Sequence, residues 1–261
     1  MQDFWQKQDH SHPLYPDLIW SRPENKHQAG KLLIAGGNAQ SFAAVNQAFS
    51  VAQQAGIGSI RVILPDVLQK SLSSIFVGAV YAPSTPSGSL SRQALGLILD
   101  NAAWADALLL SGDFGRNSET AILLESLLRS YQGRLCLTKD VIDYFNHLPL
   151  KLLDRADTMI VLSLSQLQQL NTATKSTQAI SLSMDLVRLV EFLHQFTKTH
   201  QSLIITKHLN YLLVAFKGQV ITTKESEDQA IWRVATAAKA VVWWAQNKQQ
   251  ILAAAATSFV A

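Results

Sequence analysis

Short apolar runs recur along this chain, and most are followed by a stretch with helical spacing of small and apolar residues. They are KLLIAGG at 31–37, SIRVIL at 59–64, ALLLSG at 107–112, RLCLT at 134–138, TMIVLS at 158–163 and SLIIT at 202–206. Continuous apolar runs that end at turn residues indicate strands buried on both faces. Strands that alternate with helices favour an α/β fold. We therefore expect a three-layer α/β/α sandwich around a mostly parallel central sheet.

The other expected elements complete this pattern. Helices are predicted at 41–55, from 65 onward, at 92–101, at 119–130 with Ser118 as N-cap, at 183–199, at 228–246 and at 249–259. A further strand is expected at 75–80, and a hairpin at 211–223 turns at Lys217-Gly218. Residues 1–25 are rich in proline and aromatic residues, which indicates an extended N-terminal arm. Residues 26–261 then form a single domain.

Composition excludes several classes of protein. Only 16% of the 261 residues are charged, against about 25% in a typical soluble domain, and this excludes an intrinsically disordered chain. A dispersed net charge of +3 gives no reason to expect nucleic acid. No apolar run approaches the roughly 18 residues of a membrane span. The single cysteine and the polar N-terminus predict a cytoplasmic protein, and the surplus of apolar residues predicts a homo-oligomer.

Ligands of parallel sheets bind where strands end and helices begin, and two loops at such positions are candidates. The first is the turn of Gly36, Gly37 and Asn38, whose glycines allow a ligand close to the backbone and whose following helix favours an anion. An ordinary strand-to-helix turn without a ligand is the alternative.

The second candidate loop is SGDFGR at 111–116. Gly112 and Gly115, followed by Arg116, are suited to cradling a phosphate. Asp113 opposes this role, because a carboxylate repels an anion unless Arg116 or a metal offsets its charge. The alternative is again a plain turn, with Arg116 merely exposed.

The sequence gives no support for a metal site, a P-loop or a serine-hydrolase motif. The seven histidines lack the spacing of metal ligands, so no metal site is expected, and neither a P-loop nor a G-x-S-x-G motif is present. Cys136 lies inside an apolar run and is predicted to be an inert core thiol. Trp232, Trp243 and Trp244 lie in an apolar helix and indicate core or subunit packing.

With these loops in view, the chain resembles the ribokinase-like superfamily. It is most similar to the ADP- or ATP-dependent NAD(P)H-hydrate dehydratases, whose domain is also called carbohydrate kinase-like. The resemblance is carried by HQAGKLLIAGGN at 27–38, SFAA at 41–44, AGIG at 55–58, SGDFGR at 111–116 and LTKD at 137–140. The order of elements agrees over nearly the whole chain.

The resemblance implies a ribokinase-like fold and a repair reaction in which hydrated NADH or NADPH loses water at the expense of ADP or ATP, with Mg²⁺ as a further expected cofactor. It implies that the loops containing Ala44 and Gly115 contact the hydrated dinucleotide. It also implies that Lys207 belongs to the nucleotide segment and that Asp228 is the catalytic residue.

The chain departs from the family on the nucleotide side. KESEDQA at 224–230 replaces the family's G-x-GD turn, so that glutamates stand where glycines would bind phosphate. The family's T-P-H-P-x-E segment corresponds to LSLSQ at 162–166, without its histidine and its acid.

Three functions remain open at this point. The first is a divergent dehydratase or kinase-like enzyme that uses Asp228. The second is a catalytically inactive relative that binds a nucleotide or a dinucleotide. The third is an assembly protein. The sequence leaves open whether the protein turns over any substrate.

Overall fold

Ten strands form one sheet in this computed structural model, which describes residues 3–74, 76, 78–176, 178–225 and 232–261. The order across the sheet is β1-β10-β9-β8-β7-β6-β5-β2-β3-β4. The strands are β1 Trp5–Gln8, β2 Lys31–Gly36, β3 Ser59–Pro65, β4 Val80–Ala82, β5 Ala107–Gly112, β6 Leu135–Thr138, β7 Thr158–Val161, β8 Leu203–His208, β9 Tyr211–Phe216 and β10 Gln219–Lys224. Only β9 pairs antiparallel with its neighbours. The predicted mostly parallel sheet is confirmed.

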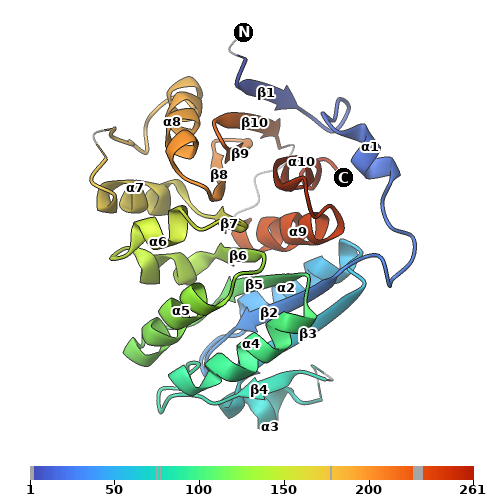
Figure 1. Cartoon of the computed structure of the whole chain (residues 1–261), viewed down its shortest axis with the longest axis vertical. Helices are drawn as coiled ribbons and strands as arrows, with labels where there is room; N and C mark the ends of the chain where they lie inside the picture. The colour runs from blue at the N-terminus through green and yellow to red at the C-terminus, as the bar shows by residue number, and fades with distance from the viewer. Residues whose placement is uncertain (1–2, 75, 77, 177, 226–231) are drawn as a thin grey trace.

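Helices cover both faces of the sheet. They are α1 Pro16–Trp20, α2 Ala43–Gln54, α3 Gln69–Leu72, α4 Leu95–Trp104, α5 Ser118–Ser130, α6 Pro149–Leu153, α7 Leu164–Ala173, α8 Leu186–Thr199, α9 Arg233–Gln246 and α10 Ile251–Thr257, with 3₁₀ helices η1 Asp66–Leu68, η2 Arg92–Ala94 and η3 Lys139–Phe145. In Figure 1, α5 to α8 lie on one side of the sheet and α9 and α10 on the other. The molecule is therefore the expected α/β/α sandwich.

The apolar strands supply both faces of the core. Leu32 and Ile34 belong to the cluster that contains α2, α9 and α10, whereas Leu33 and Ala35 belong to the cluster under α4 to α8. Successive side chains of a strand point to opposite faces, so a strand buried on both faces must be apolar throughout. Trp244 is fully buried in the first cluster, and the core packing predicted for it is confirmed.

Two expected elements begin elsewhere. The N-cap of α5 is Asn117 and not Ser118, because the Asn117 Oδ1 accepts the backbone N–H of Glu119 at 2.8 Å. Of the strand expected at 75–80, residues 75 and 77 lie outside the described residues, and the described strand there is β4, Val80–Ala82.

The other predicted helices are present and differ only at their ends, whereas α1, α6 and α7 were not predicted. Those expected at 41–55, 183–199 and 249–259 are α2, α8 and α10, each somewhat shorter than predicted. The helix expected at 228–246 is described from Arg233 onward as α9. The hairpin turns as predicted, with positive φ at Lys217 and Gly218.

The first 25 residues, expected to form an extended arm, contribute β1 and α1. β1 extends the sheet by pairing in parallel with β10. The Trp5 Nε1 donates to Thr222 Oγ1 at 3.0 Å, and the Gln8 Nε2 donates to the carbonyl of Ala256 at 2.7 Å. The arm therefore lies against the far end of the chain. Among the described helices, none is both long and apolar enough to cross a membrane.

Candidate functional site

The two predicted loops meet at the carboxyl ends of β2 and β5. Gly36 pairs with Gly112, and the Gly37 N–H donates to the carbonyl of Gly112 at 3.1 Å. A Cβ atom on Gly36 would lie 2.5 Å from that carbonyl oxygen and 2.9 Å from Ser111 Oγ. Glycine is thus required at position 36 by a close approach of two chain segments, which brings the two loops together.

Asn38 connects the loops through its side chain. Its Nδ2 donates to the carbonyl of Asp113 at 2.7 Å, and its Oδ1 accepts the N–H groups of Gln40 at 2.8 Å and Ser41 at 3.2 Å. Asn38 thus fixes its own turn and the 111–116 loop at the same time. The sequence predicted that Asn38 contacts a ligand. In the structure its side chain holds the two loops in position.

The Asp113 carboxylate lies at the start of α2. It accepts the Ala44 N–H at 2.8 Å and the Ser41 hydroxyl at 2.9 Å, and Lys139 Nζ lies 2.6 Å from its Oδ1. Burial alone would raise the pKa of Asp113, but these donors outweigh it and hold the pKa below its usual value. The charge of Asp113 is therefore offset by Lys139, whereas the sequence had offered Arg116 or a metal as the groups that could offset it.

The Asp140 carboxylate occupies the amide groups of the second loop. It accepts the N–H groups of Asp113 at 2.8 Å, Phe114 at 2.8 Å and Gly115 at 3.2 Å. Burial raises the pKa of Asp140, these N–H groups oppose the rise, and the neighbouring charge of Asp113 adds to it. The backbone predicted to cradle a phosphate therefore already holds a carboxylate of the same chain.

A cavity of about 450 Å³ opens beside the second loop. It is lined by Gly115, Arg116, Asn117, Ser118, Ala121, Asp140, Asp143 and Tyr144. The Tyr144 hydroxyl donates to the carbonyl of Gly115 at 2.6 Å and accepts the Asn117 N–H at 3.2 Å. Arg116 is exposed at the cavity. The cavity combines a cation, an aromatic ring and several polar groups, as ligand sites do.

Lys207, the described residue that was predicted for the nucleotide side, lies apart from this cluster. Lys207 is near the end of β8, which is separated from β5 by β7 and β6. Its side chain is 7% exposed, and its Nζ lies 2.7 Å from Glu225 Oε2. Asp228, the predicted catalytic residue, lies outside the described residues.

Lys139 and Gln166 are site residues that sequence reasoning did not select. Gln166 Nε2 donates to the carbonyl of Lys139 at 2.8 Å and to Asp143 Oδ1 at 2.8 Å, and its Oε1 accepts from Arg233 at 2.8 Å. Gln166 thereby joins the start of α9 to the β6–η3 turn. The sequence contained one indication of a role for Gln166, because it lies in the segment 162–166 that corresponds to the family's T-P-H-P-x-E segment.

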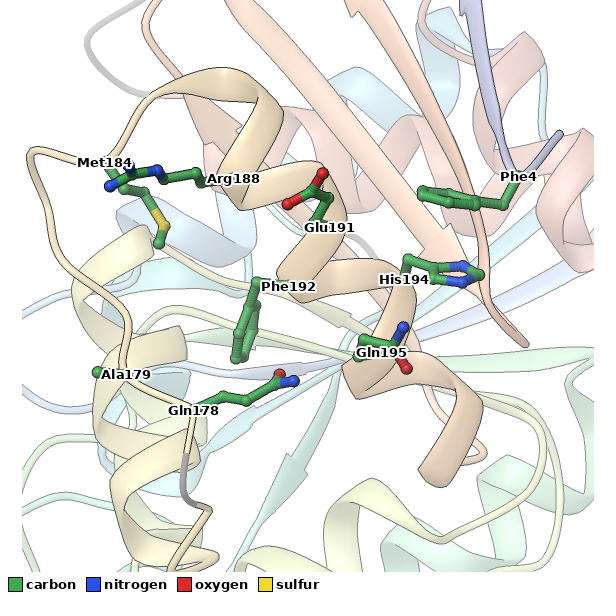
Figure 2. Close-up of a pocket in the computed structure, with 9 residues that line it drawn as sticks. All are labelled: Phe4, Gln178, Ala179, Met184, Arg188, Glu191, Phe192, His194 and Gln195. Carbon is green, nitrogen blue, oxygen red and sulfur yellow. The ribbon is translucent and has the colours of Figure 1, made fainter. Parts of the chain in front are cut away.

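A second cavity, of about 560 Å³, contains none of the predicted residues. It lies along α8, between Phe4 and the segment before the helix (Figure 2). Phe4 stacks on His194 with ring centroids 3.6 Å apart, and the His194 Nδ1 donates to the carbonyl of Gly218. None of the residues that line this cavity follows the carboxyl end of a described strand, so the β2–β5 edge remains the candidate site. Within the described part of the chain, no group of three or more His, Cys, Asp or Glu is arranged to hold a metal ion.

Comparison with known proteins gives one sequence relative. The chain is 28% identical over 116 residues to the bifunctional NAD(P)H-hydrate repair enzyme Nnr of Moorella thermoacetica. The match covers 44% of this chain and 22% of that enzyme, so the chain spans well under half of its relative. No protein-family model matches the chain.

Solved structures share its fold over nearly its whole length. A ribokinase-like superfamily protein of Enterococcus faecalis superposes with a TM-score of 0.74 at 15% identity, over 100% of this chain and 87% of that one. The ADP/ATP-dependent NAD(P)H-hydrate dehydratase of Bacillus subtilis, co-crystallised with ATP and Mg²⁺, gives 0.61 at 11% identity, over 95% and 86% of the two chains. The chain therefore has the ribokinase-like fold that its sequence predicted, and a segment of 116 residues is similar in sequence to a hydrate repair enzyme.

Proposed function

We propose that this ribokinase-like protein binds a nicotinamide dinucleotide, or its hydrated form, at the carboxyl ends of β2 and β5. It would be a divergent dehydratase-like protein that keeps the substrate half of the site. The observation that carries the proposal is the joining of the two substrate-side loops through Asn38 and Asp113, directly beside a cavity that contains Arg116. The relationship to hydrate repair enzymes selects the dinucleotide among ligands of this size.

The cavity supplies suitable chemistry for part of such a ligand. Arg116 can pair with a phosphate, and Tyr144 offers an aromatic ring. Asp143 is exposed and can accept hydrogen bonds from ribose hydroxyl groups. About 450 Å³ falls within the roughly 300–1,000 Å³ of small-molecule sites, so the cavity suits a large part of a dinucleotide.

The proposal is tested by calorimetric titration with NADH, NADPH and their hydrates in the absence of ADP and ATP. Arg116→Ala should weaken binding about tenfold, the effect of roughly 1.4 kcal/mol. Arg129→Ala is the matched control, because Arg129 is also an exposed arginine of the same region but does not line this cavity. Equal affinities of the two variants, or no binding by the wild type, would contradict the proposal.

The described residues fit a phosphate donor poorly. Lys207 is paired with Glu225, and the amides of the 111–116 loop are occupied by Asp140. These contacts support a protein that binds its ligand without nucleotide-driven turnover. If neither ADP nor ATP raises the melting temperature of the protein, the protein does not bind the phosphate donor that nucleotide-driven dehydration requires.

An active dehydratase is the second candidate, and the similarity to the Moorella enzyme favours it. It requires Asp228 as the catalytic residue. Asp228→Asn should then abolish the loss of hydrated NADH in the presence of ADP or ATP, while leaving its binding intact. Turnover at the wild-type rate would exclude that role for Asp228.

A further inference from the structure

Three positions have hydrogen-bond donors that could bind an anion, and at each of them a carboxylate of the chain itself occupies these donors. Asp113 lies at the start of α2, Asp140 at the amides of residues 113–115, and Glu225 at Lys207. The donors at these positions are those that proteins use for phosphates and carboxylates. Of the three, Asp113 lies where both predicted substrate loops meet.

The three donors around Asp113 come from two separate segments of the chain, residues 41–44 and Lys139. They are the Ser41 hydroxyl at 2.9 Å, the Ala44 N–H at 2.8 Å and the Lys139 ammonium at 2.6 Å. The Asp113 side chain is 9% exposed, so little water reaches these contacts. An incoming anionic group would have to displace Asp113, or else lie against its negative charge.

The backbone at position 113 is held independently of the side chain. The Asp113 N–H donates to Asp140 Oδ1 at 2.8 Å, and its carbonyl accepts from Asn38 Nδ2 at 2.7 Å. Its φ of 61° is one that glycine adopts without strain. Replacement by glycine should therefore keep the loop in place and leave the three donors facing an empty volume the size of a carboxylate.

We propose that Asp113 is a specificity-determining residue, whose carboxylate takes the place of an anionic ligand group and so excludes anions from the start of α2. Uncharged hydroxyl or amide groups of the ligand lie there instead, and its phosphates are directed toward Arg116. The nature of the ligand rests on the function proposed above, but the exclusion of anions does not.

The test uses Asp113→Gly with acetate and inorganic phosphate as probes. Melting temperature and calorimetric affinity are measured against chloride at equal ionic strength. We expect these anions to stabilise the variant and to bind it at least tenfold more tightly than the wild type. Adding Lys139→Gln should abolish the gain, because the ammonium group provides the charge. Asp100→Asn, which removes an exposed carboxylate on α4 that does not line this cavity, should gain no anion binding.

Each outcome decides the proposal. If Asp113→Gly is unfolded in chloride, acetate should restore its far-UV circular dichroism, because a ligand that binds the folded state stabilises it. Asp113→Asn, which keeps the side-chain shape and so fills the same volume, should gain less anion affinity than Asp113→Gly. Anion affinities equal to that of the wild type, or no recovery of structure, would overturn the proposal. This test uses no dinucleotide, so its result does not depend on whether the protein binds NADH, NADPH or their hydrates.

Discussion

Asp140→Asn is expected to destabilise the protein because one carboxylate accepts three backbone N–H groups. Oδ1 accepts from Asp113, and Oδ2 accepts from Phe114 and Gly115. An asparagine has a single carbonyl oxygen, and its NH₂ group would face an N–H donor at the other position. At least one amide of the loop then loses its acceptor, and the bonds that remain lose the charge that strengthens them.

The magnitude follows from these losses. An unsatisfied buried donor costs about 1–3 kcal/mol, and weakening of the two remaining bonds raises the total to about 2–4 kcal/mol. For a chain of this size this corresponds to roughly 4–16 °C in melting temperature. Asp143→Asn is the control, since Asp143 is exposed and accepts one bond, from Gln166 Nε2, that asparagine can also accept. Its effect should stay within about 0.5 kcal/mol.

Urea unfolding followed by circular dichroism measures the free energy of unfolding, and hydrogen exchange locates the change. The amides of residues 113–115 should exchange faster in Asp140→Asn than in Asp143→Asn. If the two variants are equally stable and the amides of residues 113–115 exchange at equal rates in both, the three hydrogen bonds of Asp140 do not hold this loop.

Other consequences of the structure can be measured on the same protein. Gly36→Ala should cost about 1–3 kcal/mol of unfolding free energy, because its Cβ would press on the Gly112 carbonyl, whereas Gly96→Ala, with open space around it, should be neutral or stabilising by up to about 1 kcal/mol. Burial raises the pKa of Tyr131 to about 12, so the folded state keeps its proton to higher pH than the unfolded state does. Between pH 10 and 12 the wild type should therefore lose up to about 2.7 kcal/mol more stability than Tyr131→Phe, and parallel pH profiles would count against this. Burial likewise raises the pKa of the Cys136 thiol, which should react with a disulfide reagent only as fast as the protein unfolds.

The sequence predicted those parts of the fold in which one physical cause dominates. β2 and β5 are apolar at every central position because both faces of the sheet are covered, and this pattern cannot be mistaken for a half-exposed strand. The Lys217-Gly218 turn could be predicted because a glycine between two apolar runs indicates a hairpin turn, in which positive φ is needed. The region 139–153 had no such signal. Its η3 and α6 are short and follow no long apolar period.

The site was predicted in its loops but not in its connections. Gly36, Asn38, Gly112 and Gly115 lie together because the ends of parallel strands share one edge. The partner of Asp113 could not be found in the same way. Lys139 is 26 residues away and reaches Asp113 only because β6 is the neighbour of β5. Strand order, which decides such pairs, is not encoded in any local pattern.

The distribution of charge at this edge of the sheet constrains how a phosphorylated ligand can be oriented. Asp113 and Lys139 neutralise each other, and Lys207 is paired with Glu225, whereas Arg116 is exposed at the cavity. A phosphate that approached the start of α2 would find the donors of Ser41, Ala44 and Lys139 already bound to the Asp113 carboxylate. The same phosphate beside Arg116 gains a bidentate partner without displacing any internal group. The dinucleotide that we propose as the ligand should therefore bind with its phosphates toward α5 and its uncharged end toward α2. A bound structure with the reverse orientation would mean that Asp113 moves on binding.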